Sequence, residues 1–350
     1  MPEFSPEALE SFVSEVFTKA GFPGEEARLI GELIVSANRV GHDSHGIRQV
    51  PRYLQRIQSG DIVAGAPVTV DRELPAMAVL NGNRTLGHVA ATRALEVAME
   101  KARAMKISAV GVHDLNHIGR IGAYPERAAR EGLVCLAWVS AQGPNRSVAP
   151  FNGMEKRLGT NPFGAGLPNP DGAPILLDFA SSVVAANKIR QAFDRGQETG
   201  PGWMIGTDGK PCRDPSVFIE GKAVQLPLGG TVGYKGYGLA VMVDLLGGML
   251  SGGDLTNPDQ KITNNCTFFI VIDPEAFLPR EEYNQKVREL IAYLKDTPPA
   301  PGHEGVILPG EYESSHHEAR RKAIFIEPNV WENIAKAGNS IEVTPPAPIG

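Results

Sequence analysis

The sequence is poor in cysteine and has no long apolar run. Its 350 residues contain three cysteines, Cys135, Cys212 and Cys266, which lie far apart and form no Cys-x-x-Cys pair. This usage argues against a disulfide scaffold and is typical of proteins in a reducing compartment. The longest apolar stretch, around residues 239–250, includes Asp244 and two adjacent glycines and is too short to span a bilayer.

The N-terminal residues do not lead us to expect an export signal, and the chain has no excess of positive charge. Residues 1–6 (Met-Pro-Glu-Phe-Ser-Pro) contain neither a basic segment nor an apolar one. The net charge is −6, from 34 basic and 40 acidic residues. This balance, without any block of five like charges, argues against nucleic acid or an anionic membrane as a partner. We therefore expect a cytoplasmic protein that acts on a small molecule.

The common nucleotide-binding and hydrolase motifs are missing as well. No Gly-x4-Gly-Lys-Ser/Thr loop occurs, and no Gly-x-Gly-x-x-Gly follows a predicted strand, so a P-loop ATPase and a Rossmann fold are not supported. His-Glu-x-x-His, Gly-x-Ser-x-Gly and paired-cysteine metal motifs are absent too. The hydrophobic content of 42% nevertheless supports a sizeable core, in one large domain or two smaller ones.

The N-terminal part of the chain predicts two packed helices. Ser5 is suited to cap a helix that Pro6 begins, and the apolar residues of segment 9–17 recur on one helical face. A second helix, with its apolar residues between positions 27 and 37, follows a Gly-Pro turn. This helix leads directly into the polar segment 41–46 (Gly-His-Asp-Ser-His-Gly).

The middle of the chain predicts an α/β unit. Residues 90–106 are typical of a helix, and residues 107–112 and 133–140 are typical of buried strands. Between the two strands lie the polar loop 113–122 and a short helix that ends at Arg130. Because ligands commonly bind beyond the carboxyl ends of strands, this loop is a candidate binding segment.

The second half of the chain has weaker patterns. Further elements are predicted in this order: loops over 141–230, a glycine cluster at 229–238, a helix at 239–250, a strand at 267–272, an amphipathic helix at 281–295, and a loop at 308–311 before a basic helical stretch.

Residues 42–45 (His-Asp-Ser-His) form the first candidate site. Reducing a ketone to an alcohol requires a proton on oxygen, and imidazole is the side chain best suited to supply it near neutral pH. A neighbouring serine hydroxyl can orient that ring. Two histidines three residues apart could instead ligate a metal. The segment could equally be a helix exit in which Asp43 and Ser44 act as caps.

Residues 116–122 (Asn-His-Ile-Gly-Arg-Ile-Gly) form the second candidate, with His113 four residues before His117. Glycines let a backbone approach phosphate closely, and the N-terminus of the helix that follows favours an anion. Arg120 could add a bidentate contact. An ordinary turn between a strand and a helix would show the same pattern.

Two further segments carry weaker signals. Lys235, in a predicted glycine-rich turn at 234–238, suggests a phosphate or ribose contact. Residues 178–182 (Asp-Phe-Ala-Ser-Ser) could line a nucleotide groove, or simply end a strand and cap a helix. The remaining histidines have no companion motif, and we interpret them as surface or structural residues: His88, His303, His316 and His317.

Taken together, these segments resemble the malate/L-lactate dehydrogenase family of the type that lacks a Rossmann fold. The likeness runs from end to end and rests on six motifs in the same order: residues 43–46, 116–122, 159–162, 178–182, 235–236 and 309–311. Six ordered motifs are far more specific than any one of them. Residues 42–47 and 117–122 most resemble the hydroxycarboxylate dehydrogenase B branch, which implies an aromatic 2-oxo acid such as phenylpyruvate or hydroxyphenylpyruvate.

The resemblance implies an α/β fold in which N-terminal helices pack on a mixed-sheet core. Residues 1–75 would carry the catalytic histidine and pack with the C-terminal part. Residues 76–265 would form the NAD(P)-binding region, and residues 266–350 would complete the first domain. The resemblance also implies a homodimer, with the cofactor held in loops and partly across the subunit interface.

The resemblance further assigns roles to individual residues. His45 is implied as proton donor and acceptor with Ser44 beside it, and His117 is a second acid/base candidate. The implied cofactor site consists of His45, Gly119, Arg120, Ile121, Ile175, Leu176, Leu177, Asp178, Phe179, Tyr234, Lys235, Asn265, Leu308, Pro309, Gly310 and Glu311. Candidate substrate contacts are Arg48, Arg52 and Thr160, and no metal is implied.

One position departs from the family pattern. Many members have an arginine four residues after the catalytic histidine, where it should pair with the substrate carboxylate, but this chain has Gln49. A buried carboxylate needs a charged partner, so either Arg48 or Arg120 supplies it or the substrate differs from malate. Lys188, at a position where some imine-reducing members have aspartate, argues against a cyclic imine as substrate.

We therefore expect reversible hydride transfer between NAD(P) and C2 of a 2-oxo or 2-hydroxy acid. One alternative is a metal-dependent hydrolase built on His42, His45, His113 and His117. Another is a nucleotide-binding protein without catalytic activity. The motifs leave the choice between NAD and NADP open.

Overall fold

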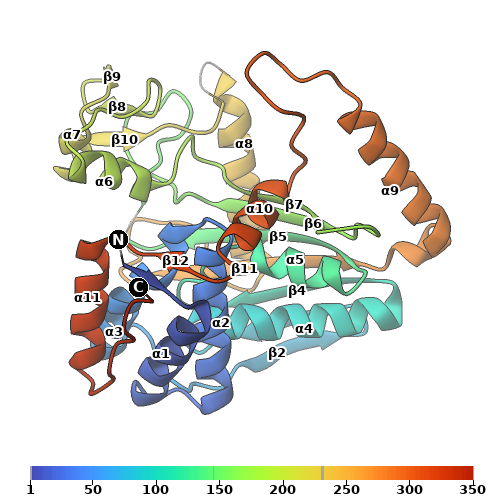
Figure 1. The fold of residues 1–350 in the computed structure, drawn as a ribbon, viewed down its shortest axis with the longest axis horizontal. Helices are drawn as coiled ribbons and strands as arrows, with labels where there is room; N and C mark the ends of the chain where they lie inside the picture. The colour runs from blue at the N-terminus through green and yellow to red at the C-terminus, as the bar shows by residue number, and fades with distance from the viewer. Residues whose placement is uncertain (1, 145, 230–231, 350) are drawn as a thin grey trace.

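A computed structural model describes residues 2–144, 146–229 and 232–349 and is built around a seven-stranded sheet (Figure 1). The strands lie in the order β2 (Thr69–Leu74), β3 (Met77–Asn81), β4 (Ile107–His113), β11 (Asn264–Ile272), β5 (Val134–Gln142), β6 (Pro162–Leu167) and β7 (Ile175–Ala180). Strands β3 and β4 are parallel, whereas the other neighbouring pairs are antiparallel. The expected mixed sheet is therefore confirmed.

Helices cover both faces of this sheet. Strand β5 places Cys135, Ala137 and Val139 on one face, where they join the core formed with α4 (Gly87–Met105) and α5 (Ala123–Arg130). Side chains alternate along a strand, so Ser140 lies on the other face. There its hydroxyl contacts Asp244 in the π-helical turn that follows α8 (Tyr234–Val243).

The two ends of the chain share a separate apolar core. Helices α1 (Pro6–Lys19), α2 (Gly24–Arg39) and α3 (Val50–Gln58) pack with α11 (Pro328–Asn339). Strand β1 (Glu3–Phe4) pairs with β12 (Ile324–Phe325), and the rings of Phe4 and Trp331 lie 4.0 Å apart. The C-terminal segment thus packs against the N-terminal helices, as Figure 1 shows where blue and red elements meet.

The region predicted as loops contains a small lobe with its own core. Strands β8 (Met204–Gly206), β9 (Pro211–Cys212) and β10 (Ala223–Gln225) form a three-stranded sheet beside α6 (Ala186–Asp194) and α7 (Pro215–Ile219). Four buried apolar side chains hold it together: Val184, Ile189, Met204 and Ala223. Strands this short give little periodicity, which explains why the pattern predicted loops.

One predicted boundary was wrong. Helix α8 begins at Tyr234, five residues before the predicted start, so Lys235 lies in its first turn and not in a glycine-rich loop. Residues 230 and 231 of the glycine cluster lie outside the described residues. Gly236 is required inside the helix, because a Cβ there would overlap the backbone of Leu228.

Helices α9 and α10 match predicted positions, whereas α3 and α11 were not predicted. Helix α9 (Arg280–Lys295) contains no buried residue and projects from the body at the right of Figure 1. Helix α10 (Glu311–Ala319) follows the predicted loop at 308–311 and lies against the N-terminal helices. In the part of the chain that the structure describes, no helix combines the length and the apolar character needed to cross a membrane.

The central strand β11 provides a test of the core. Phe269 is 0% exposed between α4 and the sheet, whereas Phe277, just beyond the strand, is 75% exposed. We expect Phe269→Ala to lower the free energy of unfolding by about 3–5 kcal/mol, because it leaves a cavity that the packed sheet cannot close. Urea unfolding measures this loss. The control Phe277→Ala should change stability by less than about 0.5 kcal/mol, and equal effects of the two variants would contradict this packing.

Candidate active site

The turn between α2 and α3 carries the first predicted catalytic residues. Two short 3-10 turns, Asp43–His45 and Ile47–Gln49, join the helices and place His45 beside Ser44. The Ser44 hydroxyl lies 2.9 Å from His45 Nδ1. The predicted pairing of a histidine with an orienting hydroxyl is therefore present.

Asn38, near the end of α2, supports this turn from below. Its Nδ2 donates to Asp43 Oδ1 at 2.6 Å, and its Oδ1 accepts from the Ile47 N–H at 2.8 Å. Gly46 lies so close to this amide that any Cβ would overlap it. Asn38 is 3% exposed, and nothing in the sequence indicated this role.

Gln49 supports the same turn and does not act as a substrate anchor. It is buried, and its Nε2 donates to the Ser44 carbonyl at 2.6 Å. Arg48 points to a different cavity of about 200 Å³, which it shares with Arg195 and Arg320. Neither residue therefore takes the place of the arginine that the family pattern leads one to expect.

The second histidine segment lies directly against the first. Strand β4 ends at His113, and the loop that follows brings the His117 ring parallel to the His45 ring, with centroids 5.6 Å apart and an interplanar angle of 12°. Tyr53, from α3, lies with its hydroxyl 2.6 Å from His117 Nδ1. The structure thus brings together both predicted acid/base candidates and adds a buried tyrosine.

His88 belongs to the same cluster, which the sequence did not indicate. It is 1% exposed in the first turn of α4, and its ring packs edge-on against Tyr53 with centroids 5.7 Å apart. Neither ring nitrogen has a hydrogen-bond partner among the residues that the structure describes. His303 and His317 are exposed, whereas His88 is buried, so of the two interpretations, surface or structural, only the second fits His88.

Burial sets the charge state of these histidines. It lowers the pKa of His45 to about 4, and the nearby carboxylate of Asp178 opposes this shift only in part. Burial also lowers the pKa of His117 well below its usual range, with His45, His88, Arg52 and Arg56 acting in the same direction. The rings are therefore neutral at pH 7.

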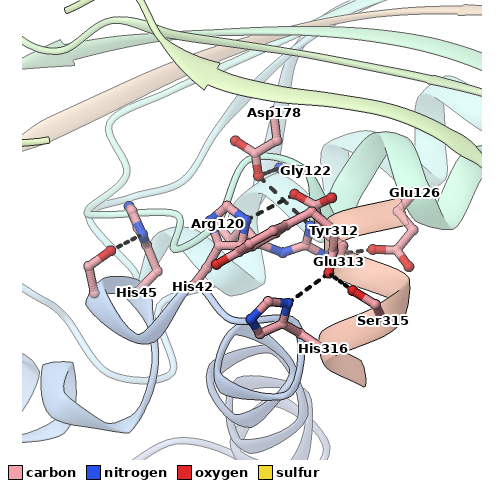
Figure 2. A network of polar contacts seen from close by, with 11 residues as sticks. His42, His45, Arg120, Gly122, Glu126, Asp178, Tyr312, Glu313, Ser315 and His316 are labelled. Atoms are coloured by element: carbon pink, nitrogen blue, oxygen red, sulfur yellow. Dashed lines mark hydrogen bonds and ion pairs between the residues drawn. The ribbon is translucent and has the colours of Figure 1, made fainter. Parts of the chain in front are cut away.

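The predicted cofactor loop around Arg120 contacts β7, the predicted cofactor strand. The Arg120 side chain is 2% exposed, with Nη2 2.5 Å from Glu126 and Nη1 3.8 Å from Asp178 on β7. The Gly122 N–H donates to Asp178 Oδ2 at 3.0 Å. Figure 2 shows Arg120 between the two carboxylates, close to His42 and His45.

Helix α10 connects the loop before it to the catalytic turn. His42 Nε2 lies 3.0 Å from Glu313, and Arg320 Nη1 lies 2.8 Å from Asp43. Figure 2 shows Glu313 reaching from α10 toward His42 and Arg120. At the other end, the Pro309 carbonyl accepts from the Leu176 N–H at 3.1 Å, so the loop is paired with β7.

A cavity adjoins this loop. It measures about 480 Å³ and is lined by Ile175, by the loop of Leu308, Pro309, Gly310 and Glu311, and by basic residues including Lys295. This volume is within the range of small-molecule and cofactor sites. Lys295 also pairs with Glu311 at 2.6 Å.

The other predicted cofactor residues, Tyr234, Lys235 and Asn265, lie on α8 and β11. Tyr234 is 54% exposed on α8 and packs against Phe151, and Lys235 beside it is exposed. Asn265, on β11, is buried, and its N–H donates to the Leu115 carbonyl near the His117 loop. The Thr160 carbonyl accepts from Ser181, just beyond the end of β7.

The four histidines of the hydrolase alternative do not converge. His42 is paired with Glu313, and His113 lies 2.9 Å from Asp71 and 3.4 Å from Asp114. Across the described ranges, no group of three or more histidine, cysteine, aspartate or glutamate side chains is arranged to hold a metal ion. The hydrolase alternative therefore has no structural support in the described residues.

Comparison with known proteins identifies the family. The family model described as malate/L-lactate dehydrogenase matches residues 4–335. The chain belongs to the malate/L-lactate dehydrogenase family. Hydroxycarboxylate dehydrogenase B of Escherichia coli (strain K12) is 35% identical over 97% of this chain and 94% of that protein. Malate dehydrogenase of Pyrococcus abyssi (strain GE5 / Orsay) is 37% identical over 90% of this chain and 88% of that protein.

Solved structures of the malate/L-lactate dehydrogenase family share the fold. Malate dehydrogenase from Pyrococcus horikoshii OT3 superposes with a TM-score of 0.89 at 32% identity, covering 98% of this chain and 97% of that one. The predicted family, the fold class and the likeness to hydroxycarboxylate dehydrogenase B are confirmed. As a member of this family, the protein is a hydroxyacid dehydrogenase.

The burial of His88 predicts that the stability of the protein depends on pH. Burial lowers its pKa from 6.5 to about 3, with His45 acting in the same direction, so the unfolded chain binds the proton more tightly. The free energy of unfolding should therefore be greatest above pH 6.5 and fall as the pH drops toward 3. Replacing His88 by glutamine should make this fall shallower by up to about 1.4 kcal/mol per pH unit. Urea unfolding at several pH values measures it.

The exposed His303→Gln is the matched control for His88→Gln and should keep the wild-type slope. A His88→Gln slope equal to that of the wild type would show that His88 is not held neutral by burial.

Proposed function

We propose that the protein transfers a hydride reversibly between NAD(P) and C2 of a 2-oxo or 2-hydroxy carboxylic acid. The observation that carries this proposal is the stacked pair of His45 and His117 beside the loop of Arg120. Imidazole rings able to bind the substrate oxygen and a loop suited to a dinucleotide would then meet at one place. Relatives named malate dehydrogenase and L-sulfolactate dehydrogenase support the same class of acid.

The residues around Arg120 fit a dinucleotide. Arg120 Nε and Nη1 are buried and have no hydrogen-bond partner among the residues that the structure describes. Gly119 and Gly122 on either side pack against His88 and Asp178 without space for a Cβ, which holds the loop beside Arg120. The N-terminus of α5, which begins at Ala123, favours an anionic group such as a pyrophosphate.

The bound nicotinamide would supply the hydride, and the protein would supply binding, orientation and protons. The strand residues Ile175, Leu176, Leu177, Asp178 and Phe179 would hold the nucleotide together with Gly119, Arg120, Ile121 and the loop of Leu308, Pro309, Gly310 and Glu311. Tyr234, Lys235 and Asn265 remain proposed contacts on the basis of the resemblance alone.

His45 would carry the proton in this reaction. In the direction of oxidation, its neutral ring accepts the proton of the substrate hydroxyl, and the low pKa favours this neutral form. In the direction of reduction, the protonated ring gives the proton back to the oxygen on C2. The carboxylate of Asp178 already raises the pKa of His45, and an anionic 2-oxo acid in the site would raise it further.

Arg52 is the proposed anchor for the substrate carboxylate. Arg120 is paired with Glu126, and Arg48 faces another cavity. Arg52 is exposed on α3 next to Tyr53, on the segment that contacts His117. Thr160 is proposed as a further substrate contact. The resemblance to hydroxycarboxylate dehydrogenase B supports an aromatic side chain, such as that of phenylpyruvate or hydroxyphenylpyruvate.

The function is tested with a panel of pyruvate, oxaloacetate, phenylpyruvate, hydroxyphenylpyruvate and glyoxylate, each with NADH and NADPH. We expect nicotinamide oxidation with at least one of these acids. His45→Ala should lower kcat/KM by about 10²–10⁴-fold, because general acid–base catalysis is lost. The exposed His303→Ala is the control and should keep wild-type activity.

Two outcomes of this panel would contradict the proposal. Full activity of His45→Ala would remove its acid/base role. Tight binding of NADH or NADPH by the wild type without turnover of any 2-oxo acid would instead favour a nucleotide-binding protein without catalysis.

We also propose a homodimer in which α9 contacts the partner subunit. Leu290, Tyr293 and Leu294 share one face of this helix and are 52%, 76% and 37% exposed. Large exposed apolar patches of this kind mark interaction surfaces. Because Lys295 at the end of α9 pairs with Glu311, the contact would lie beside the proposed cofactor loop.

The double variant Leu290→Asp/Tyr293→Asp tests this dimer. We expect it to shift the protein from twice the mass of the chain to the mass of one chain in size-exclusion chromatography with light scattering. A double substitution of the polar residues Asn284→Asp/Gln285→Asp, which lie away from this face of the same helix, is the control and should remain dimeric. A wild type that has the mass of one chain at micromolar concentration would contradict the proposal.

A further inference from the structure

Two hydrogen-bonding groups converge on the same nitrogen of His117. The Tyr53 hydroxyl lies 2.6 Å from His117 Nδ1, and the backbone N–H of Gly119 lies 3.3 Å from it. A hydroxyl can donate or accept, but a backbone N–H can only donate. The Gly119 contact therefore requires a lone pair on Nδ1, and the Tyr53 hydroxyl must donate to the same atom. A neutral His117 then carries its proton on Nε2.

Packing fixes the backbone conformation of Gly119, and with it the direction of its N–H. Its φ is +76°, a conformation that suits glycine, and a Cβ at this position would overlap His88 Nε2. His88 also packs edge-on against the Tyr53 ring. The buried His88 ring therefore packs against both Gly119 and Tyr53, the two residues that contact His117 Nδ1. This packing gives His88 a role in the site.

Neither Tyr53 nor His117 changes protonation easily. Tyr53 is 0% exposed, and burial raises the pKa of its hydroxyl above its usual range, so that it keeps its proton. Burial and the cationic side chains of Arg52 and Arg56 favour the neutral ring of His117. The arrangement is thus stable across the pH range in which histidines ordinarily titrate.

His45 is held differently. Its Nδ1 contacts the Ser44 hydroxyl at 2.9 Å, and this hydroxyl can donate to Nδ1 or accept from it. Both neutral tautomers and the imidazolium form of His45 can keep the contact. Of the two stacked rings, His45 is therefore suited to exchange a proton and His117 is suited to keep one.

We infer that His117 is a fixed Nε2–H donor to the oxygen on C2 of the substrate, and that Tyr53 is the positioning residue that selects this tautomer. This inference rests on the proposed function. With bound nicotinamide supplying the hydride to C2, the electron pair of the C=O π bond would move to oxygen, and protonated His45 would give its Nε2 proton to that oxygen. His117 stabilises the oxygen through its hydrogen bond and ends the reaction with the same proton.

The tautomer is measured directly by NMR on the full-length protein, labelled with ¹⁵N-histidine and without cofactor. The His117 signals are assigned by their loss in His117→Gln. We expect Nδ1 to have the chemical shift of an unprotonated nitrogen and Nε2 that of a protonated one. Neither shift should change between about pH 5.5 and 8.5, where histidines ordinarily titrate. A protonated Nδ1, or an imidazolium at pH 7, would overturn the inference.

Kinetics with matched variants separate hydrogen bonding from proton transfer. Glutamine can donate an N–H but cannot carry a proton, so His117→Gln should lose about 10-fold in kcat/KM, whereas His117→Phe should lose about 10²–10³-fold. His45→Gln should lose about 10²–10⁴-fold, because no proton carrier remains. A His117→Gln loss as large as that of His45→Gln would show that His117 transfers the proton.

Tyr53→Phe removes a donor to Nδ1. We expect its His117 to show a mixture of the two tautomers by NMR and its kcat to fall about 10-fold, with little change in KM. Tyr283→Phe is the control, because it also removes a hydroxyl hydrogen bond, in this case to the Pro168 carbonyl. Tyr283 lies outside the proposed site. Wild-type tautomer ratios in Tyr53→Phe would remove Tyr53 from this role.

The NMR result does not depend on turnover. If no 2-oxo acid is reduced, the proposed function fails while the tautomer is still measured. If 2-oxo acids are reduced but Nδ1 carries the proton, only the inference about Tyr53 and His117 fails.

Discussion

The side-chain amide of Asn38 is the contact on which the site depends. It holds Asp43 through its nitrogen and the Ile47 N–H through its oxygen, so a five-residue turn is fixed by one buried group. Because Gly46 lies against this amide without space for a Cβ, the turn has little room to move. The orientation of His45, and with it the stacking on His117, follows from that constraint.

Burial of several imidazoles in one cluster gives the site its chemistry. Charged rings at this spacing would repel one another in a medium of low polarity, so His45, His88 and His117 all favour the neutral form. The differences among them come from their hydrogen-bond partners. Ser44 permits exchange of the proton on His45, whereas Tyr53 restrains the proton on His117.

Helix α10 joins the proposed cofactor loop to the proposed acid/base residue. Its first turn follows Gly310, which is pressed against β7, and its Glu313 contacts His42 three residues before His45. Arg320, just beyond the helix, holds Asp43. The contacts of Glu313 with His42 and of Arg320 with Asp43 therefore connect the loop to the catalytic turn.

The sequence alone determined the family, the mixed α/β class and the two histidine segments, because six ordered motifs and helical periodicity are local properties of the chain. It missed His88, because a histidine in the first turn of a helix has no pattern that distinguishes a buried ring from an exposed one. It placed Lys235 in a loop, since close approach at Gly236 involves a distant backbone. Only the tertiary structure decided that the Gln49 side chain turns back to Ser44 and that Tyr53 meets the distant His117, because side-chain hydrogen bonds depend on packing that no local pattern encodes.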